Sequence, residues 1–189
     1  MIRRGSVANH GATTMQPHEL TALIRRHAGL IHKVAYAYCR NPTDREDVAQ
    51  EVAVQLWRSA ARYDARCKET TWVYRIALNV AISFHRREHR HRERKLDVDV
   101  HAITLAAVPT PEPDEHVELL RDCIDGLDPL EKALVLLYLD GNDHASIADV
   151  LGISVSNVGT KLGRTKTKLR DALDRRARSN RTGGSHATR

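Results

Sequence analysis

The most regular hydrophobic pattern in the chain lies between residues 144 and 164, HASIADVLGISVSNVGTKLGR, and predicts two short amphipathic helices joined by a tight turn. Gly152 supplies the backbone freedom of the turn, Ile153 fills the corner, and Ser154 is a good N-cap for the second helix. Three apolar residues share one face of the first helix: Ile147, Ala148 and Leu151. The inward positions of the second helix recur at helical spacing: Val155, Val158, Leu162 and Leu169.

The spacing of Ala148, Gly152 and Val158 is that of a helix-turn-helix. The opposite face of its second helix is polar, and six residues there are candidates to meet DNA: Ser156, Asn157, Thr160, Lys161, Arg164 and Lys168. Small side chains at Ser156, Thr160 and Gly163 let such a helix enter a major groove. Asn157 and Arg164 then reach base edges, and the lysines reach phosphates. The alternative is a helical hairpin with a solvated outer face, and the pattern favours DNA binding.

Helical periodicity also runs from Glu19 to Lys95, where glycine and proline are scarce apart from the Asn41-Pro42 turn. The following stretch is acidic and rich in proline, and a second helical block begins at about Glu115, with Asp128-Pro129 starting one of its helices. We therefore predict an all-α fold of two small helical domains joined by an acidic, Pro-containing linker. The expected segments are a disordered start at 1–15, domains at 16–95 and 115–176, the linker at 96–114 and a disordered tail at 177–189.

The segment DREDVAQEVAVQLWR predicts a helix with a docking surface. Its inward stripe is Val48, Val52 and Leu56. The other side then carries acids and a polar residue beside two exposed apolar ones: Asp47, Gln50, Val54 and Trp57. The alternative is that Trp57 packs against the loop around Tyr63, and the sequence leaves both open.

The segment TTWVYRIALNVAISFHRREHRHR predicts a helix with a basic outer stripe. Its inward positions are Val73, Ile76, Ala77, Val80 and Phe84. The outer positions are Trp72, Arg75, Asn79, Ser83, Arg86 and Arg90. Guanidinium groups suit phosphates, an aromatic ring suits an unstacked base, and an amide suits base edges, so this stripe favours nucleic acid over a merely solvated basic helix end.

The chain has 189 residues and a formal net charge of +6, with a pI near 9.5, which suits a polyanionic partner. No apolar run approaches the length of a membrane span, and the opening segment lacks the apolar stretch of a secretory signal. We expect a cytoplasmic protein without membrane insertion. The chain has three widely separated cysteines: Cys39, Cys67 and Cys123. An odd, scattered set does not suggest a disulfide framework, so we expect reduced thiols.

His85, His89 and His91 include a one-turn spacing that a metal could use, but no nearby carboxylate or cysteine completes a site. We expect a basic, solvated helix end there and no metal. The chain also lacks a glycine-rich phosphate loop, a nucleophile elbow and a converging carboxylate pair. We therefore expect no enzyme activity and no cofactor.

Together these segments resemble a bacterial sigma-70-family sigma factor of the extracytoplasmic-function (ECF) type, from Leu20 to about Leu173. DREDVAQEVAVQLWR resembles the family's core-polymerase-binding helix, and TTWVYRIALNVA is similar to the segment that melts and reads the minus-10 element. The stretch from Leu119 to Arg170 resembles the fourth sigma domain, which reads the minus-35 element. No further sigma domain fits between Lys95 and Glu115, which indicates the ECF type.

The resemblance implies roles for the matching residues. Those that would meet the coiled-coil clamp of the polymerase's largest subunit are Asp47, Gln50, Glu51, Val54 and Trp57. Those that would bind the minus-10 element are Arg66, Lys68, Trp72, Arg75, Asn79, Arg86 and Arg90. In that set the loop from Arg66 to Glu69 would help to pocket an everted base, and Asn79 would contact the separated strand. The minus-35 element would meet the six polar residues of the helix-turn-helix.

The implied partners are core RNA polymerase and promoter DNA, with an anti-sigma factor as a further candidate. Two positions depart from the family pattern: Ala53, where many relatives have a large apolar residue, and Gly159, where a basic residue is common. One rival interpretation is a conventional helix-turn-helix regulator that acts on duplex operators; another is a helical adaptor that docks through the Trp57 face. Met15 is an alternative start, which the sequence does not decide.

Overall fold

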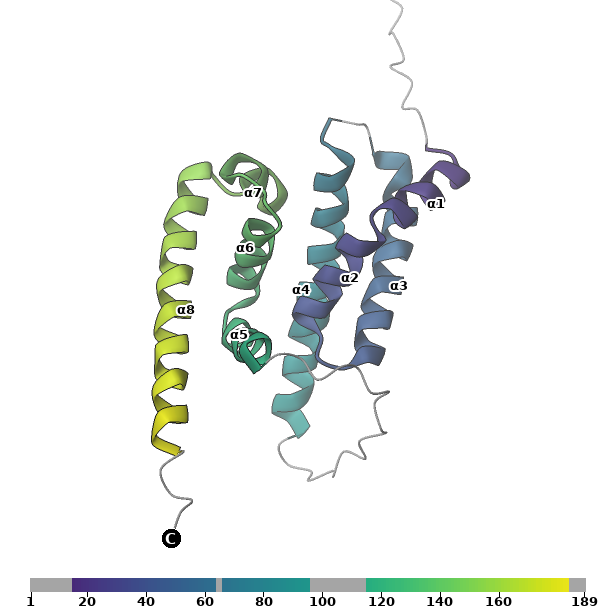
Figure 1. Ribbon diagram of the computed structural model, residues 1–189. Coiled ribbons are helices and arrows are strands. Elements are labelled where there is room, and N and C mark those ends of the chain that lie inside the picture. Colours follow the sequence, from purple (N-terminus) through teal and green to yellow (C-terminus); the bar gives the residue numbers. More distant parts are fainter. Residues whose placement is uncertain (1–14, 64–65, 96–114, 184–189) are drawn as a thin grey trace, which may run out of the picture.

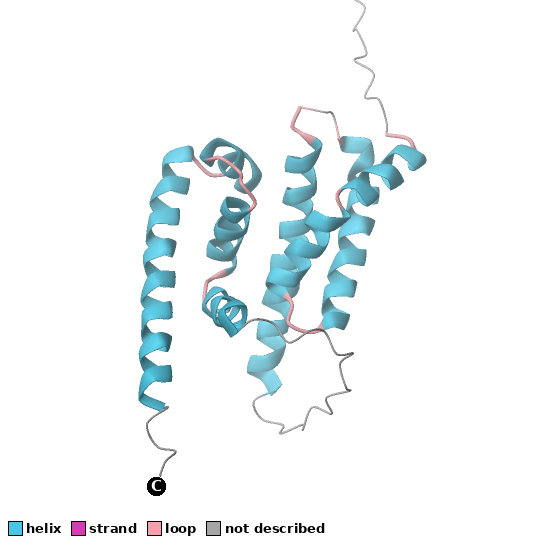
Figure 2. Ribbon diagram, in the orientation of Figure 1, coloured by secondary structure: helices cyan, strands magenta, loops and turns pink. Residues whose placement is uncertain are grey.

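The computed structural model describes residues 15–63, 66–95 and 115–183, and the regular elements in these ranges are all helical (Figure 2). The N-terminal domain is built from α1 (Pro17–Arg26), α2 (Ala28–Tyr38), α3 (Pro42–Ser59) and α4 (Glu69–Lys95), with a 3-10 turn at Ala60–Arg62. The C-terminal domain is built from α5 (Glu115–Asp125), α6 (Pro129–Leu139), α7 (His144–Leu151) and α8 (Val155–Gly183). The predicted all-α fold is confirmed. The expected disordered start before Met15 and the expected linker at 96–114 lie outside the described residues.

The core of the N-terminal domain forms where α2, α3 and α4 pack together (Figure 1). The side chain of Asn41 caps α3 by accepting a hydrogen bond from the backbone N–H of Thr43 at 3.0 Å, and Pro42 follows at the start of the helix, where no amide donor is needed. The predicted inward stripe of α3 is almost fully buried: Val48, Val52 and Leu56. Burial of each such side chain contributes about 1.5–3 kcal/mol.

The inward face of α4 is only partly as predicted. Val73 and Ala77 are fully buried, but so are three residues that the prediction left out: Tyr74, Leu78 and Ala81. Three residues predicted to be inward are only half-buried: Ile76, Val80 and Phe84. The reason is that α4 packs against α2 and α3 and also against α6 and α7 of the other domain, so its buried sector is wider than that of a surface helix.

In the C-terminal domain local capping signals set the helix starts. Asp128 accepts hydrogen bonds from the backbone N–H groups of Leu130 and Glu131 at 2.9 Å each, and the Glu131 side chain bonds back to the Asp128 amide, which forms a capping box before α6. Asp143 caps α7 through the backbone N–H of Ser146 at 2.7 Å. Buried residues of α6 pack against α7 and α8 and include Ala133, Leu134 and Leu137.

The predicted turn between α7 and α8 is confirmed. Gly152 has a φ of 67°, the left-handed conformation that favours glycine, and the Ser154 hydroxyl accepts a hydrogen bond from the backbone N–H of Asn157 at 3.2 Å. Val158 and Leu162 are buried, but Val155 is 49% exposed. Its predicted inward position is wrong because Val155 is the first residue of α8 and the buried stripe begins one turn later.

Helix α8 is longer than predicted. It continues to Gly183, so residues 177–183 are helical and not part of a disordered tail. The segment after Leu173 holds four arginines, which favour helix, and it has no glycine or proline before Gly183. None of the described helices is long and apolar enough to cross a membrane.

The two domains pack directly against each other. In Figure 1, α6 and α7 lie between α4 and α8, and α8 forms the edge of the molecule farthest from the N-terminal domain. The Tyr38 hydroxyl donates a hydrogen bond to the Pro129 carbonyl oxygen at 2.6 Å across this contact. Burial raises the pKa of Tyr38, so this phenol stays protonated as the donor.

Candidate nucleic-acid interface

The outward face of α3 carries the predicted docking residues. Asp47 and Gln50 are exposed, as are the two apolar residues Val54 and Trp57, at 41% and 54%. More than half of Trp57 is exposed, and the Tyr63 ring stacks on Trp72, so the structure favours the docking interpretation over packing of Trp57 against the loop around Tyr63. Glu51 is turned differently: it is half-buried and accepts a hydrogen bond from Gln55 Nε2 at 2.6 Å.

Glu51 and Gln55 belong to a groove of about 630 Å³ that runs between α3 and α4. Three arginines line it on the α4 side: Arg86, Arg87 and Arg90. Asn79 and Ser83 add an exposed amide and an exposed hydroxyl. The structure thus brings Asn79, Arg86 and Arg90 of the predicted basic stripe together beside the docking face. Arg87 was not predicted as a site residue, although it lies next to Arg86 in the same basic run.

Trp72 is not on the outer face, which corrects the sequence prediction. It is 9% exposed, and its ring stacks on Tyr63 with the centroids 4.6 Å apart. The Tyr63 hydroxyl in turn donates a hydrogen bond to the Cys67 carbonyl oxygen at 3.0 Å. Trp72 therefore anchors the loop before α4 and does not offer a free ring face. In that loop Arg66 and Lys68 are exposed, as their predicted role requires.

Arg75 faces the C-terminal domain. Its guanidinium donates to the backbone carbonyl of Asp149 in α7, from Nε at 3.1 Å and Nη2 at 2.7 Å, and from Nη2 to the Asp149 carboxylate at 2.7 Å. Arg75 thus points outward from its own domain, as predicted, but its side chain is partly covered by α7 of the neighbouring domain.

The outer face of α8 is open along most of its first turns. Five of its six predicted contact residues are exposed: Ser156, Asn157, Thr160, Arg164 and Lys168. Lys161 is half-buried, and Lys168 forms an ion pair with Glu131 at the start of α6. Gly159 lies against α7, where an added Cβ would meet the His144 ring at 3.8 Å, an ordinary van der Waals distance.

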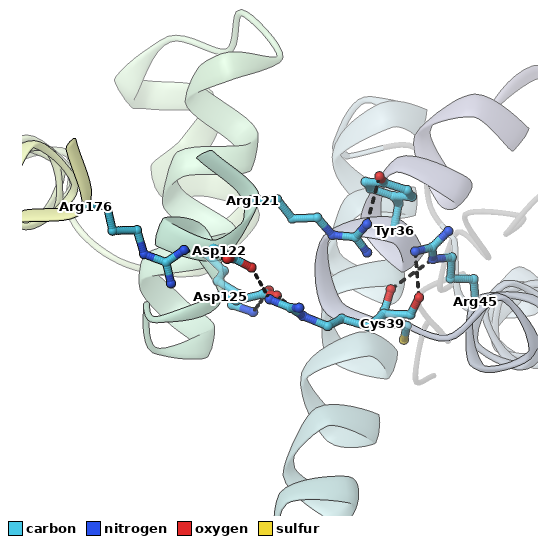
Figure 3. Close-up of polar contacts among 9 residues, drawn as sticks. Tyr36, Cys39, Arg45, Arg121, Asp122, Asp125 and Arg176 are labelled. Carbon is cyan, nitrogen blue, oxygen red and sulfur yellow. Dashed lines mark hydrogen bonds and ion pairs between the residues drawn. The ribbon is translucent and has the colours of Figure 1, made fainter. Parts of the chain in front are cut away.

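A polar network between the domains was not predicted (Figure 3). Arg40, just after α2, bonds Asp125 at 2.6 Å and Asp122 at 2.6 Å, both on α5. Arg176 of α8 also bonds Asp122 at 2.5 Å, and bonds from Arg176 and Arg40 lower the pKa of that carboxyl.

A second contact between the domains is made by Tyr36. Its ring lies between the Arg45 and Arg121 guanidinium groups, whose central carbons are 4.2 and 4.3 Å from the ring centroid.

Asp125 is the more enclosed acid of this network. Burial opposes its ionisation, but bonds from Lys132 at 2.8 Å and from Arg40 outweigh burial and lower its pKa. Lys132 itself is only 3% exposed, so the pair satisfies a charge that is otherwise costly to bury. Among the described residues no group of three or more His, Cys, Asp and Glu side chains is placed to hold a metal ion. The side chains of His89 and His91 lie outside the described part of the chain.

Two protein-family models match the chain. The family described as "Sigma-70 region 2" matches residues 23–91, and the family described as "Sigma-70, region 4" matches residues 117–169. The chain belongs to the sigma-70 family. Its curated relatives place it in the ECF class. Sigma-70 factors are the transcription initiation factors that direct RNA polymerase to promoters.

Several relatives of this sigma factor carry informative names. It is 30% identical over 155 residues to "ECF RNA polymerase sigma factor SigE" of Mycolicibacterium smegmatis, covering 80% of this chain and 60% of that protein. It is 28% identical to "RNA polymerase sigma factor CnrH" of Cupriavidus metallidurans, covering 80% and 85%. It is 26% identical to "ECF RNA polymerase sigma factor SigW" of Bacillus subtilis, covering 76% and 82%.

Solved structures agree with the fold. The chain is similar to CnrH in its complex with the cytosolic domain of CnrY, with a TM-score of 0.61, 23% identity, and coverage of 86% of this chain and 92% of that one. It is also similar to the sigma factor RpoE bound to the anti-sigma factor NepR from Bartonella quintana, with a TM-score of 0.60, 16% identity, and coverage of 83% and 95%. At these identities the likeness supports the fold alone.

Proposed function

We propose that this sigma factor binds core RNA polymerase through α3, opens the minus-10 element along α4 and reads the minus-35 element with α8. The observation that supports this proposal most strongly is that two sigma regions match the two domains. Each domain presents its own exposed polar or basic face. A conventional regulator needs only one DNA-binding face, and no observation favours that alternative.

The docking face for polymerase is the exposed strip of α3 with Asp47, Gln50, Val54 and Trp57. An exposed tryptophan beside acids is costly to leave in water, and tryptophan is a frequent energetic anchor in protein interfaces. Glu51 lies at the edge of this strip, on the side of the groove, where its carboxylate accepts a hydrogen bond from Gln55.

The minus-10 surface is the α4 side of the groove between α3 and α4, together with the loop before α4. Asn79 supplies an amide for the edge of an unpaired base, and Arg86 and Arg90 supply guanidinium groups for the backbone. Lys68 and Arg66 extend the positive charge into the loop. Trp72 supports this surface by holding the loop against Tyr63 and is not itself a base-stacking platform.

The minus-35 surface is the outer face of α8. Asn157 and Arg164 project from it for base edges, Lys161 serves phosphates, and the small side chains of Ser156 and Thr160 allow close approach to the duplex. Lys168 reaches DNA only if it leaves Glu131, because the two form an ion pair in the protein alone.

The same proposal covers the remaining expectations. The protein is not an enzyme in its own right, acts in the cytoplasm where the polymerase is, and needs no cofactor. An anti-sigma factor is a candidate regulator, and two of the similar structures are sigma factors bound to other proteins, one of them described as an anti-sigma factor.

A reconstituted transcription assay tests the proposal. Purified chain and sigma-free core polymerase are mixed with a pool of DNA fragments that carry random upstream sequence, and the transcripts are sequenced. The mixture is expected to initiate on a selected subset of fragments, while neither component alone does so. Tight operator binding by the chain without any effect on core polymerase would instead support a conventional helix-turn-helix regulator.

A further inference from the structure

Val155 is an exposed apolar residue at the start of α8. It is 49% exposed, and it is the only large hydrophobic residue among the exposed side chains that the structure describes in this helix. Ser154 precedes it as the N-cap, and Ser156 and Asn157 follow it, all of them exposed. An isopropyl group therefore stands within a polar run, at the end of the helix that a helix-turn-helix inserts into the major groove.

The side of α8 next to Val155 carries no side chain at two further positions. Gly159 and Gly163 follow Val155 by four and eight residues, so the three positions lie on one side of the helix. A Cβ at Gly163 would meet nothing within 4 Å, and one at Gly159 would meet only the His144 ring, at 3.8 Å. Neither glycine has a positive φ.

The fold therefore explains neither glycine. Glycine is unfavourable inside a helix, and the space at Gly159 and Gly163 would admit a side chain. A partner that approaches the helix backbone closely does explain their presence. The helices that pack on α8 are mainly α5, α6 and α7, and in Figure 1 the start of α8 lies at the edge of the molecule far from the N-terminal domain. The side next to Val155 is thus open to such a partner.

Duplex DNA offers one apolar group that suits Val155. The base edges in the major groove display hydrogen-bond donors and acceptors, and the 5-methyl group of thymine is the apolar group among them. An apolar protein partner fits this position less well, because the neighbours Ser154, Ser156 and Asn157 are polar and exposed, whereas the centre of a protein interface is apolar.

We propose that Val155 is a specificity-determining residue of the minus-35 surface: its methyl groups contact the 5-methyl group of one thymine, and Gly159 leaves room for that base edge. The proposal rests on the function proposed above, because it takes the first turns of α8 as the part that enters the groove. The contact needs no hydrogen bond. Discrimination arises because two apolar groups leave water together, which adds an apolar position to the polar ones at Asn157 and Arg164.

Replacement of thymine by deoxyuridine tests the contact, because deoxyuridine lacks only the 5-methyl group and keeps every hydrogen-bonding group. A duplex is first selected from a random pool by the full chain, alone and with core polymerase, and each thymine is then replaced in turn. Fluorescence anisotropy is expected to show about a fourfold loss of affinity at one thymine, the effect of leaving one methyl group unburied, and far less elsewhere. A selected duplex in which no methyl group affects binding would overturn the proposal.

Variants of Val155 show whether this residue is the partner of that methyl group. Val155→Ala is expected to bind the thymine and deoxyuridine duplexes with affinities within about 1.5-fold of each other, whereas Val155→Ile should keep the discrimination. Leu139→Ala is the matched control, because it truncates an apolar side chain of the same domain that is 66% exposed and lies outside α8. It is expected to keep the full discrimination. Undiminished discrimination by Val155→Ala would overturn the proposal.

Circular dichroism keeps loss of folding apart from loss of contact. Val155 is half-exposed, so Val155→Ala is expected to preserve helix content. A variant that unfolds loses affinity for both duplexes alike, and Val155→Ile then decides, because it keeps the apolar side chain.

Failure of the proposed function has a different signature. A chain that distinguishes thymine from deoxyuridine through Val155 but never supports transcription by core polymerase would contradict the function and leave the methyl contact intact. A chain that initiates transcription and is indifferent to every thymine methyl group would contradict the contact alone. Selection of no duplex, with or without core polymerase, would overturn both.

Discussion

Trp57 and Trp72 are the two tryptophans of the chain, and their burial assigns them different tasks. Trp57 is 54% exposed on the docking face of α3, so Trp57→Ala is expected to weaken core-polymerase binding by about 2 kcal/mol while the fold survives. Affinity pull-down with core polymerase and thermal unfolding measure the two effects.

Trp72→Ala is the matched control for that prediction. Trp72 is 9% exposed and stacked on Tyr63, so its replacement is expected to cost about 3–5 kcal/mol of folding stability. A reversal, in which Trp57→Ala unfolds the protein and Trp72→Ala only weakens polymerase binding, would contradict the assignment of both residues.

Lys161 and Arg164 are one turn apart on α8 but are expected to contribute differently to DNA binding. Lys161→Ala removes a phosphate contact, so it should weaken binding to all duplexes alike and reduce the slope of log affinity against log salt by about 1. Arg164→Ala should instead cost more on the preferred upstream element than on other sequences. Fluorescence anisotropy over a salt series separates the two, and identical salt slopes for Lys161→Ala and the natural chain would argue against the phosphate role.

The sequence predicts correctly which side chains of a helix are buried where only one face of that helix packs against the rest of the protein. The Val48, Val52 and Leu56 stripe is buried and the opposite face is exposed, as periodicity requires. Trp72 was misplaced because its orientation depends on Tyr63, nine residues earlier across a loop whose course no periodicity reveals. Tyr74 was missed because its partner, Asp140, belongs to the other domain.

Helix starts are the elements that local chemistry specifies most strongly. Asp128 caps α6 through two hydrogen bonds of 2.9 Å, so Asp128→Ala is expected to lower the free energy of unfolding of the C-terminal domain by about 1–2 kcal/mol. Urea unfolding followed by circular dichroism measures this. Asp171→Ala, an exposed acid inside α8, should change stability by less than about 0.5 kcal/mol and serves as the control. Equal losses would show that the capping box is not what stabilises this helix start.

The turn residues Gly152, Ser154 and Pro129 were predictable because each acts on its own backbone within a few residues. The end of α8 was not, because helix-favouring residues continue past the last apolar position and nothing in the hydrophobic pattern marks where the helix stops.

At the scale of the whole molecule the sequence predicted two domains but not their contact. Arg40 and Asp122 are 82 residues apart, and Arg75 and Asp149 are 74 apart, so no local pattern connects them. Of these four residues only Arg75 was given a role from the sequence, as part of the basic outer stripe of its helix.

The interdomain acids make the contact between the two domains sensitive to acid rather than to neutral pH. Burial opposes ionisation of Asp140, but bonds from Lys33 and Tyr74 of the other domain outweigh burial and lower the pKa of Asp140. The pKa of Asp122 is lowered first by Arg176 of its own domain and then by Arg40, so only the Arg40 part belongs to the domain contact. A group with a lowered pKa stabilises the contact above its unperturbed pKa, and this stabilisation is lost as the pH falls through the lowered value. The radius of gyration is therefore expected to be constant between about pH 7 and pH 5 and to rise only below about pH 4.

Opening between about pH 7 and pH 5 would point to histidine and would contradict the role of these carboxylates.

The central claim is that two surfaces on two domains act on different promoter elements, and a permanganate footprint on a selected promoter tests it most directly. Asn79→Ala holoenzyme is expected to bind the duplex almost normally but to leave the minus-10 element unreactive, because the exposed amide of α4 is needed for strand opening. Arg164→Ala holoenzyme is expected to lose about 1–3 kcal/mol of duplex binding at the minus-35 element. A template with a pre-melted minus-10 bubble should rescue Asn79→Ala and not Arg164→Ala. Normal opening by Asn79→Ala, or a bubble that treats both variants alike, would contradict the division of labour between α4 and α8.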